Sequence, residues 1–358
     1  IGTDSEKELA EDLWGCLQTC VAYSLTNSRH TGLLLSGGWD SRTLLPALIS
    51  CQAPSRLSVL SHGDPHSREL EIVSELCNEV GVRPRLRPIG PQELKPTYLR
   101  ETHRRCGTCQ FPHWRTSGQE LANISTDRLV AGVFGEVLGG HYGPSMAMTG
   151  CSRAKYIVEQ LFGLSTPGTK RNNEVSRLNY GDVHNLLAQG VNNVRTFFKD
   201  AFWHEHSDVR NGVRHTVESE VNRLRRRGVD SPARLIEAYM TEHRGAQYIN
   251  AQVRSARIES SVGLPFAHQR LLSHASRIPI DLKIHNRQNR LMLHRVRPSL
   301  LEIPLGAVLV PASAPLFVQE SSRAVRKAWE QCRWWLHDVS SGRVPRPRLS
   351  WLDFEFLA

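Results

Sequence analysis

Residues 36–41, Ser-Gly-Gly-Trp-Asp-Ser, combine side chains and backbone groups that could bind an anion together with a metal ion. The apolar run before them, residues 32–35, predicts a buried strand, and the sequence from Asp40 onward predicts a helix. The two glycines permit a tight turn, and N–H groups and the helix dipole converge on such a turn and attract anions. Because Asp40 would repel a bare phosphate, its position favours a divalent cation between the carboxylate and bound phosphates.

The elements that must position this segment alternate between strands and helices. Such alternation predicts an α/β fold with a parallel twisted sheet flanked by helices. Ligands of these sheets bind beyond the carboxyl ends of the strands, where residues 36–41 are expected to lie. Helices are expected over residues 5–27, from Asp40 and over 65–81 with Gly81 as the C-cap, and strands over 32–35, 56–63, 83–90 and at the start of 127–143.

Strand signals fade after about residue 148, and long helical patterns follow, so we expect a mostly helical C-terminal half. The last segment contains prolines, arginines and late aromatic residues. It is predicted to be extended and to dock through Trp351, Phe354 and Phe356. The predicted division is an α/β nucleotide-binding region at 1–148, a helical region at 149–330 and a basic, aromatic tail at 331–358.

Composition limits the class of protein. The net charge of +10 and the isoelectric point of about 9.4 indicate an anionic partner such as a nucleotide or nucleic acid. The sequence has no run of 18 apolar residues, so no membrane span is expected. The N-terminus is polar and acidic, unlike a signal peptide, and begins with Ile1, which predicts processing or a cut from a longer chain. The eight cysteines are expected to be reduced thiols of a cytoplasmic protein.

Several segments together resemble a known family. LLLSGGWDSRTLLPAL, at residues 33–48, resembles the pyrophosphate loop of the N-type ATP pyrophosphatases, the PP-loop superfamily. Residues 61–82, 131–143, 261–272 and 277–285 resemble later segments of the asparagine synthetase-like branch, in the right order. The resemblance implies an adenine nucleotide alpha hydrolase-like fold and a synthetase domain without the family's glutaminase domain.

The family's chemistry follows from this resemblance. Its members use ATP and magnesium to activate a carboxylate as an acyl-adenylate with release of pyrophosphate, and an amine or ammonia then forms an amide. The substrate would be a small-molecule or peptide carboxylate, and ammonia from glutamine would need a partner subunit or a removed N-terminal domain. The resemblance implies Ser36, Gly37, Gly38 and Ser41 at the pyrophosphate, Asp40 and Glu136 as the catalytic magnesium ligands, and Leu34, His62, Gly63 and Gly132 as further nucleotide-binding residues.

The chain departs from the family at the second acidic loop. Aligned through Gly139 and Gly140, the family's second magnesium aspartate falls on Gly135, and Glu136 falls on the next acid. Shifting the alignment by one residue puts Glu136 in the place of the aspartate. Glu136 is the expected magnesium ligand in either case, and the alternative is a solvated loop acid.

Other family residues are missing. A Glu-x-Arg pair and an aspartate are replaced by Ser261, Gly263 and His268, and residues 301–320 contain no Lys or Arg. Arg323, Arg326 or Lys327 could replace the family's late pyrophosphate-binding lysine. These losses leave a changed substrate or a lost activity as alternatives.

Three further alternatives stay open. A PP-loop enzyme that modifies tRNA would suit the basic charge, although nucleic acid is not the favoured partner. His103, Cys106, Cys109 and His113 have a spacing that could ligate zinc, but four ligands so close together make a poor closed site, and a redox pair or packed thiols are the alternatives. The basic residues 223–228 are expected to form a solvated helix face rather than a nucleic-acid patch.

Overall fold

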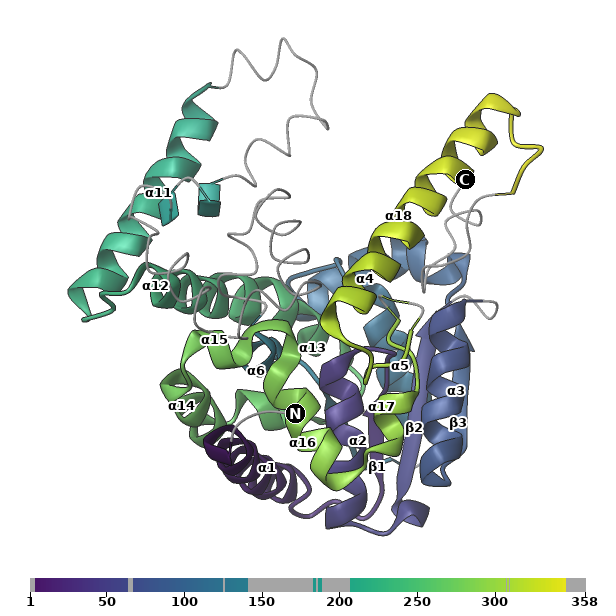
Figure 1. Ribbon diagram of the computed structural model, residues 1–358. Helices are drawn as coiled ribbons and strands as arrows, with labels where there is room; N and C mark the ends of the chain where they lie inside the picture. Colours follow the sequence, from purple (N-terminus) through teal and green to yellow (C-terminus); the bar gives the residue numbers. More distant parts are fainter. Residues whose placement is uncertain are drawn as a thin grey trace. The chain divides into compact units, whose positions relative to one another are not determined.

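The fold is described from a computed structural model, shown in Figure 1. It describes residues 4–63, 67–124, 126–140, 183–184, 186–188, 207–306, 308 and 310–345. The chain forms two compact units. The first contains the described parts of residues 1–139, 248–277 and 286–358, and the second contains those of residues 140–247 and 278–285.

The first unit is built on a five-stranded sheet in which all strands are parallel. The strands lie in the order β3-β2-β1-β4-β5, so the order reverses beside β1, and the crevice between β1 and β4 is the usual ligand position in such sheets. The predicted parallel α/β sheet is therefore confirmed. The strands are β1 (Thr31–Leu34), β2 (Leu57–Gly63), β3 (Pro84–Pro88), β4 (Arg128–Ala131) and β5 (Val262–Gly263).

Buried apolar residues explain the central strands. All four residues of β1 are buried, as expected for a strand covered on both faces. The register pairs Leu34 with Leu60 of β2 and with Ala131 of β4. Three neighbouring strands therefore bring the segments that follow them to the same edge of the sheet.

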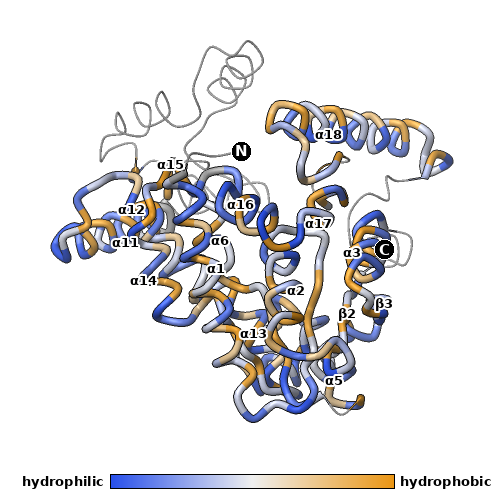
Figure 2. Tube along the Cα trace, turned by 60° about the horizontal axis from the view of Figure 1, so that its bottom comes forward, coloured by the Kyte–Doolittle hydropathy of each residue, from blue (hydrophilic) through white to orange (hydrophobic). Residues whose placement is uncertain are grey.

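Helices cover the sheet with their apolar faces, which are orange in Figure 2. The helix α3 shows clearly how the sequence determines a helix. Its apolar residues Leu70, Val73 and Leu76 are buried, and it ends at Gly81, whose left-handed φ of 73° suits a glycine C-cap. The helices of this unit are α1 (Asp4–Ser24), α2 (Trp39–Cys51), α3 (Arg68–Val80), α4 (Pro96–Cys106), α5 (Pro112–Asn123), α6 (Glu136–Gly139), α13 (Asn250–Ala256), α14 (Gln269–Arg277), α16 (Arg287–Val296), α17 (Ser299–Glu302) and α18 (Leu316–Val339).

The division into units differs from the predicted boundaries at 1–148, 149–330 and 331–358. Residues from the expected helical region complete the first unit, because β5 extends the sheet beside β4 and α1 packs against α14 and α16. The amide of Leu129 donates to the carbonyl of Ser261 over 2.7 Å, which fixes this late strand to the sheet. Sequence order alone could not show that the chain returns to the sheet.

The described part of the second unit is helical, in agreement with the predicted helical C-terminal half. It contains α11 (Ser207–Arg226), α12 (Pro232–Tyr239), α15 (Ile280–Lys283) and most of a π-helical segment, Met240–Ile249. Lys283 is fully buried and donates to Glu237 over 2.6 Å. Burial lowers the pKa of Lys283. Of the predicted solvated helix face at 223–228, residues 225–228 are exposed, whereas Leu224 is buried and Arg223 is half-buried and pairs with Glu220 and Glu242.

Two remaining predictions concern the surface of the chain. No described helix has the length and apolar character needed to cross a membrane. The expected docking residues of the tail, Trp351, Phe354 and Phe356, lie outside the described residues. The described cysteines are all free thiols.

Candidate functional site

A cavity of about 330 Å³ opens at the carboxyl ends of β1, β2 and β4 in the first unit. This volume lies at the lower end of the range of small-molecule and cofactor sites. Most of the predicted site residues line it, whereas Gly37 and Gly63 do not. The predicted residues in its wall are Leu34, Ser36, Gly38, Asp40, Ser41, His62, Gly132 and Glu136.

The turn between β1 and α2 presents two hydroxyl groups to this cavity. Ser36 Oγ and Ser41 Oγ are 3.0 Å apart, and the amide of Gly38 donates to Ser36 Oγ over 3.3 Å. No side chain caps the start of α2 at Gly38. The amides of the first helical turn, together with the helix dipole, can therefore attract an anion.

Gly37, in contrast, is held on both sides by the protein. Its amide donates to Glu69 Oε1 over 3.0 Å, and its carbonyl accepts from the amide of Gly306 over 3.2 Å. A Cβ on Gly37 would lie 3.2 Å from Gly306 N, so glycine is needed for this close approach. The Glu69 carboxylate thus accepts the hydrogen bond of an amide that the resemblance assigns to the binding of pyrophosphate. Burial raises the pKa of Glu69.

Arg42 is the largest fully buried side chain of the site region. Its Nη1 donates to the carbonyls of Leu300 and Ile303 over 3.0 and 2.7 Å. Its Nη2 donates to the carbonyl of Pro304 over 2.5 Å and to that of Gly37 over 3.3 Å. Burial lowers the pKa of Arg42 to about 10, so the guanidinium stays charged at neutral pH. Arg42 therefore fastens the 300–304 segment to the turn, a role that the sequence interpretation did not assign.

Asp40 and Glu136 form an acidic pair at this edge of the sheet. Asp40 Oδ1 is buried and has no hydrogen-bond partner among the described residues. Burial, and then the nearby charge of Glu136, raise the pKa of Asp40 well above its usual value. The structure thus brings together the two residues predicted as magnesium ligands, from turns far apart in the sequence.

Gly135 resolves the ambiguity of the acidic loop. A Cβ at this position would lie 2.3 Å from Asp40 Cγ, so the Asp40 carboxylate fills the space that a side chain would need. The position on which the family's aspartate falls in one alignment therefore cannot carry a carboxylate here. Glu136, the next residue, supplies the second acid.

The donor set of this pair suits a magnesium ion. Mg²⁺ is commonly bound by one or two carboxylates together with phosphate oxygens and water. A buried carboxylate oxygen with no hydrogen-bond partner, next to a second acid, gains most from such a cation. The residues Asp40 and Glu136 therefore fit the group that the resemblance implies.

Other potential metal sites fit less well. Among the described residues, Glu220, Glu242 and His243 of the second unit form the one cluster of three potential ligands. Arg223 already bonds both of these glutamates.

The four residues of the zinc alternative, His103, Cys106, Cys109 and His113, do not form such a cluster in the structure. Cys106 Sγ instead lies 3.2 Å from the carbonyl oxygen of Thr102 and 3.3 Å from that of Thr108, so its single thiol proton is shared between these two acceptors.

A further part of the cavity wall comes from residues that the sequence interpretation did not assign to the nucleotide site. Phe111 directly precedes α5, and His113 and Trp114 lie in its first turn. Ile249 directly precedes α13, and Gln252 lies within it. Their segments do not match a motif, although the aromatic residues so close together in QFPHW could have drawn attention. The rings of Phe111, His113 and Trp114 make this part of the lining an aromatic wall.

Two neighbouring histidines line the cavity, His62 near the end of β2 and His113 in α5, and both rings are neutral at neutral pH. The rings of His62 and His113 are 4.7 Å apart, and His62 Nδ1 is 2.9 Å from Ser117 Oγ. Because Ser117 Oγ donates to the carbonyl of His113, it accepts the proton of His62 Nδ1, which assigns that tautomer. Burial lowers the pKa of both rings, to about 4 for His113.

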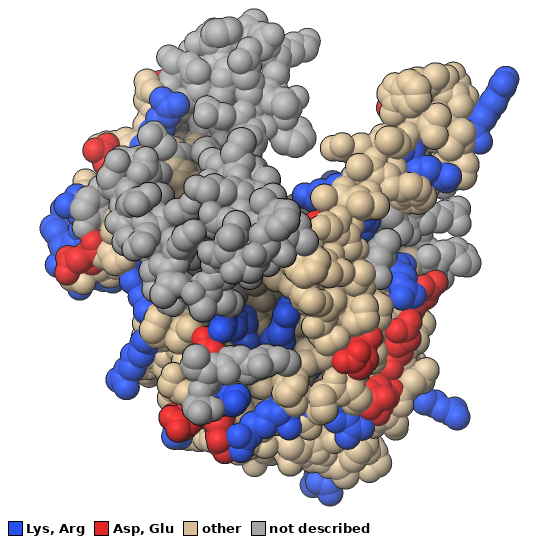
Figure 3. Space-filling view, viewed as in Figure 1, with Lys and Arg blue, Asp and Glu red and all other residues tan. Residues whose placement is uncertain are grey.

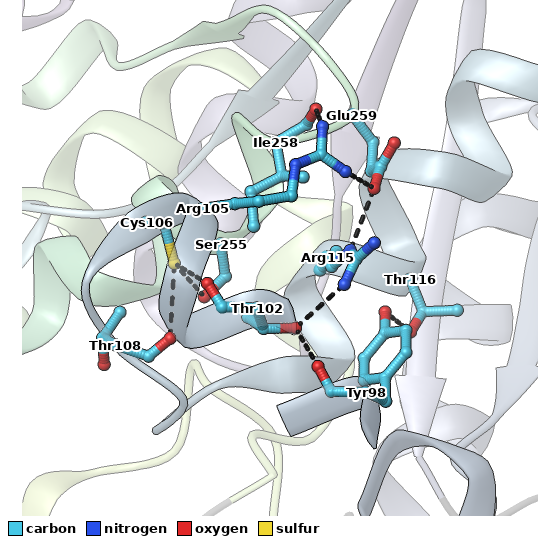
Figure 4. A network of polar contacts seen from close by, with 10 residues as sticks. All are labelled: Tyr98, Thr102, Arg105, Cys106, Thr108, Arg115, Thr116, Ser255, Ile258 and Glu259. Atoms are coloured by element: carbon cyan, nitrogen blue, oxygen red, sulfur yellow. Dashed lines mark hydrogen bonds and ion pairs between the residues drawn. The ribbon is translucent and has the colours of Figure 1, made fainter. Parts of the chain in front are cut away.

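A polar network behind this wall joins α4 and α5 to the segment after α13 (Figure 4). Glu259 Oε1 accepts from Arg105 Nη1 over 3.1 Å and from Arg115 Nε over 2.9 Å. Arg115 Nη1 also donates to Thr102 Oγ1 over 3.2 Å. A Cβ on Gly118 would lie 2.7 Å from the carbonyl oxygen of Ala256, so α5 and α13 approach closely. The network therefore fixes the spacing of the helices that carry the aromatic wall.

The expected replacements for missing family residues lie elsewhere. None of the described residues that line the cavity is Lys or Arg. On α18, Arg323 pairs with Glu320 and Arg326 pairs with Glu330. His268 stacks against Tyr23 with a ring separation of 5.5 Å. These side chains take part in packing and in ion pairs along α18 and do not line the cavity.

Fold and site together define an α/β protein with an anion-attracting strand–helix turn and an acidic pair at the reversal point of a parallel sheet. No protein-family model matches the chain, and comparison with curated proteins finds no significant match. A more specific class of protein must therefore be inferred from the residues of the site.

Proposed function

We propose that the chain is an ATP-dependent carbon–nitrogen ligase of the asparagine synthetase-like, PP-loop type. It would adenylate a substrate carboxylate and transfer the acyl group to an amine or ammonia. The observation that carries this proposal is the acidic pair, Asp40 and Glu136, beside the Ser36–Ser41 turn at the carboxyl edge of β1 and β4. A cytoplasmic location stays a prediction.

The side chains of the turn have distinct roles in this proposal. Ser36 and Ser41 donate their hydroxyls, and the free N-terminus of α2 its amides, to the phosphates of ATP. Asp40 and Glu136 would hold magnesium, which supplies charge neutralisation for the leaving pyrophosphate. Fixed donors cost no reorganisation as this charge develops, which is their main contribution to rate.

The apolar part of the cavity would serve the adenosine and the acyl group. Leu34 and His62, at the ends of β1 and β2, line the side expected to face adenosine. Phe111, Trp114 and Ile249 narrow the cavity with apolar surface. Exclusion of water by these side chains would protect a reactive acyl-adenylate from hydrolysis.

Exchange of labelled pyrophosphate into ATP, with a panel of carboxylates, tests the proposal. We expect carboxylate-dependent exchange that needs Mg²⁺ and is lost in Asp40→Asn. The matched control is Asp12→Asn, which changes an exposed acid of α1 and should behave as wild type. Carboxylate-dependent exchange that persists in Asp40→Asn would contradict the assigned site.

Two observations favour a second candidate, a nucleotide-binding protein that has lost catalysis. No described residue of the cavity wall is Lys or Arg, and the amide of Gly37 is taken by Glu69. ATP binding without exchange under any condition would support this candidate. Exchange that requires RNA, with binding that weakens steeply with salt, would instead support a tRNA-modifying enzyme.

A further inference from the structure

Selection of one nucleotide among several has to come from the cavity itself. Figure 3 shows Lys and Arg side chains scattered among acidic and uncharged residues on the face in view, and no described residue of the cavity wall is Lys or Arg. Basic side chains would in any case attract every nucleoside triphosphate alike, because the phosphates are the same. Selectivity therefore depends on the groups of the wall that meet the base.

Two parts of the cavity lining differ in their chemistry. The Ser36–Ser41 turn, with its hydroxyls and helix amides, is the part that suits phosphates. The aromatic wall presents ring faces, and the ring of His62 lies 6.4 Å from that of Trp114. Bases stack on aromatic side chains. A nucleotide whose phosphates lie at the turn would therefore direct its base towards these rings.

Ser117 fixes the tautomer of His62. It is fully buried in α5, and its Oγ donates to the carbonyl of His113, one turn earlier, over 2.9 Å. A serine hydroxyl has a single proton, so Oγ meets His62 Nδ1, also 2.9 Å away, as an acceptor. Only the tautomer with its proton on Nδ1 makes both contacts hydrogen bonds. Nε2 is therefore the acceptor nitrogen of the His62 ring.

The side of the His62 ring that carries Nε2 is turned towards the cavity. His62 is half-buried and lines the cavity, whereas its Nδ1 is turned to the fully buried Ser117, and the two ring nitrogens point in nearly opposite directions. Burial lowers the pKa of His62, so the ring stays neutral at neutral pH and Nε2 keeps its lone pair. A ligand group that meets Nε2 must therefore donate a hydrogen bond.

We propose that His62, oriented by Ser117, selects adenine over purine bases that carry an oxo group in place of the exocyclic amino group. The amino group of adenine can donate to Nε2, whereas the oxo group is an acceptor. To bind an oxo purine, the ring would have to move its proton to Nε2 and give up its bond to Ser117. His62 is thus a specificity residue and Ser117 a positioning residue. The inference rests on the proposed function, because it requires a nucleotide in this cavity.

Titration with ATP and with inosine triphosphate, each with Mg²⁺, tests the inference. We expect wild type to bind ATP at least about tenfold more tightly, since a buried hydrogen bond left unmade has a cost of this order. Ser117→Ala removes the group that fixes the tautomer, so the preference for ATP should largely disappear. The matched control is Ser74→Ala on α3. Ser74 Oγ also donates to a carbonyl one turn earlier over 2.9 Å, and this variant should keep the wild-type preference.

The outcomes separate the inference from the proposed function. Equal binding of the two nucleotides by wild type, or an unchanged preference in Ser117→Ala, would overturn the inference and leave the proposed function standing. Binding of neither nucleotide would contradict the proposed function and the inference with it.

NMR of the ¹⁵N-labelled imidazole rings tests the tautomer without a change at Ser117. We expect Nδ1 of His62 to carry the proton in wild type, with the signals of this ring identified by their loss in His62→Gln. A proton on Nε2 would overturn the inference even if Ser117→Ala does not fold.

Discussion

The two glycine-containing turns of the site, after β1 and after β4, use glycine for different contacts. Gly37 leaves room for the backbone of Gly306, which belongs to a late segment of the chain. Gly135 leaves room for the carboxylate of Asp40, a functional side chain. A glycine in the sequence thus marks a close approach without telling which atoms approach.

The electrostatics of the two turns differ as well. The first turn lies between opposite charges, with Arg42 at the carbonyl of Gly37 and Glu69 at its amide. The second brings Glu136 to Asp40, which are both acids. The protein therefore balances the charge of the first turn itself, whereas the second turn brings together the two acids of the proposed magnesium site.

The largest expected effect comes from removing the support of the first turn. Arg42→Met leaves buried carbonyls without their donor, so the free energy of unfolding should fall by roughly 3 kcal/mol or more. Urea denaturation measures this change. Arg56→Met, at an exposed arginine, is the control and should have little effect. Equal stability of the two variants would show that Arg42 does not hold the turn.

The second turn should respond less in stability and more in binding. In Gly135→Ala the added Cβ clashes with Asp40 Cγ, so the carboxylate must move, at a cost of about 1–3 kcal/mol in stability. Calorimetric titration should show that Mg²⁺-dependent binding of ATP is lost. In the control Gly15→Ala the Cβ of α1 meets no neighbour, and the helix should gain about 0.5–1 kcal/mol. If Gly135→Ala bound Mg²⁺·ATP as tightly as wild type, the space at Gly135 would not be needed for metal binding by Asp40.

Neutralising Glu69 tests whether the charge that the protein places at the first turn opposes the binding of ATP. Glu69→Gln keeps an acceptor for the amide of Gly37 but removes a negative charge beside the expected phosphates, so ATP should bind about tenfold more tightly. Equilibrium titration with ATP measures the change. The matched control is Glu71→Gln, an exposed acid of the same helix. Weaker binding by Glu69→Gln alone would mean that this carboxylate supports the nucleotide instead of competing with it.

The last expected effect concerns His113 of the aromatic wall and depends on pH. Burial lowers the pKa of His113 to about 4, below the 6.5 of an unperturbed histidine, so between these values the unfolded chain binds more protons than the folded chain. The free energy of unfolding should therefore decrease as the pH falls from 6.5 towards 4. His113→Gln should reduce this decrease by about 1 kcal/mol per pH unit, whereas His103→Gln, at an exposed position, should not. Identical pH profiles of thermal unfolding would contradict a neutral buried His113.

The sequence predicted the strands and turns that carry local signals. The buried run before Ser36 predicted β1, and the periodic apolar residues before Gly81 predicted α3. The pairing of Asp40 with Glu136 came from the family resemblance, and the sheet accounts for it, because both residues follow strands whose carboxyl ends share one edge.

The remaining parts of the site depend on contacts between distant segments. The contact of Arg42 with the 300–304 segment and the arrival of α13 beside α5 leave no periodic or motif signal. The alignment shift at Gly135 could be resolved only by the space that Asp40 occupies.

Calorimetric titration of ATP into wild type and Asp40→Asn, each with and without Mg²⁺, tests the central claim most directly. Because a proton competes with the metal for Asp40, whose pKa is raised, binding should also strengthen as the pH rises. The account predicts Mg²⁺-dependent ATP binding by wild type that Asp40→Asn abolishes. Equal binding by the two proteins, or no binding by wild type, would contradict it.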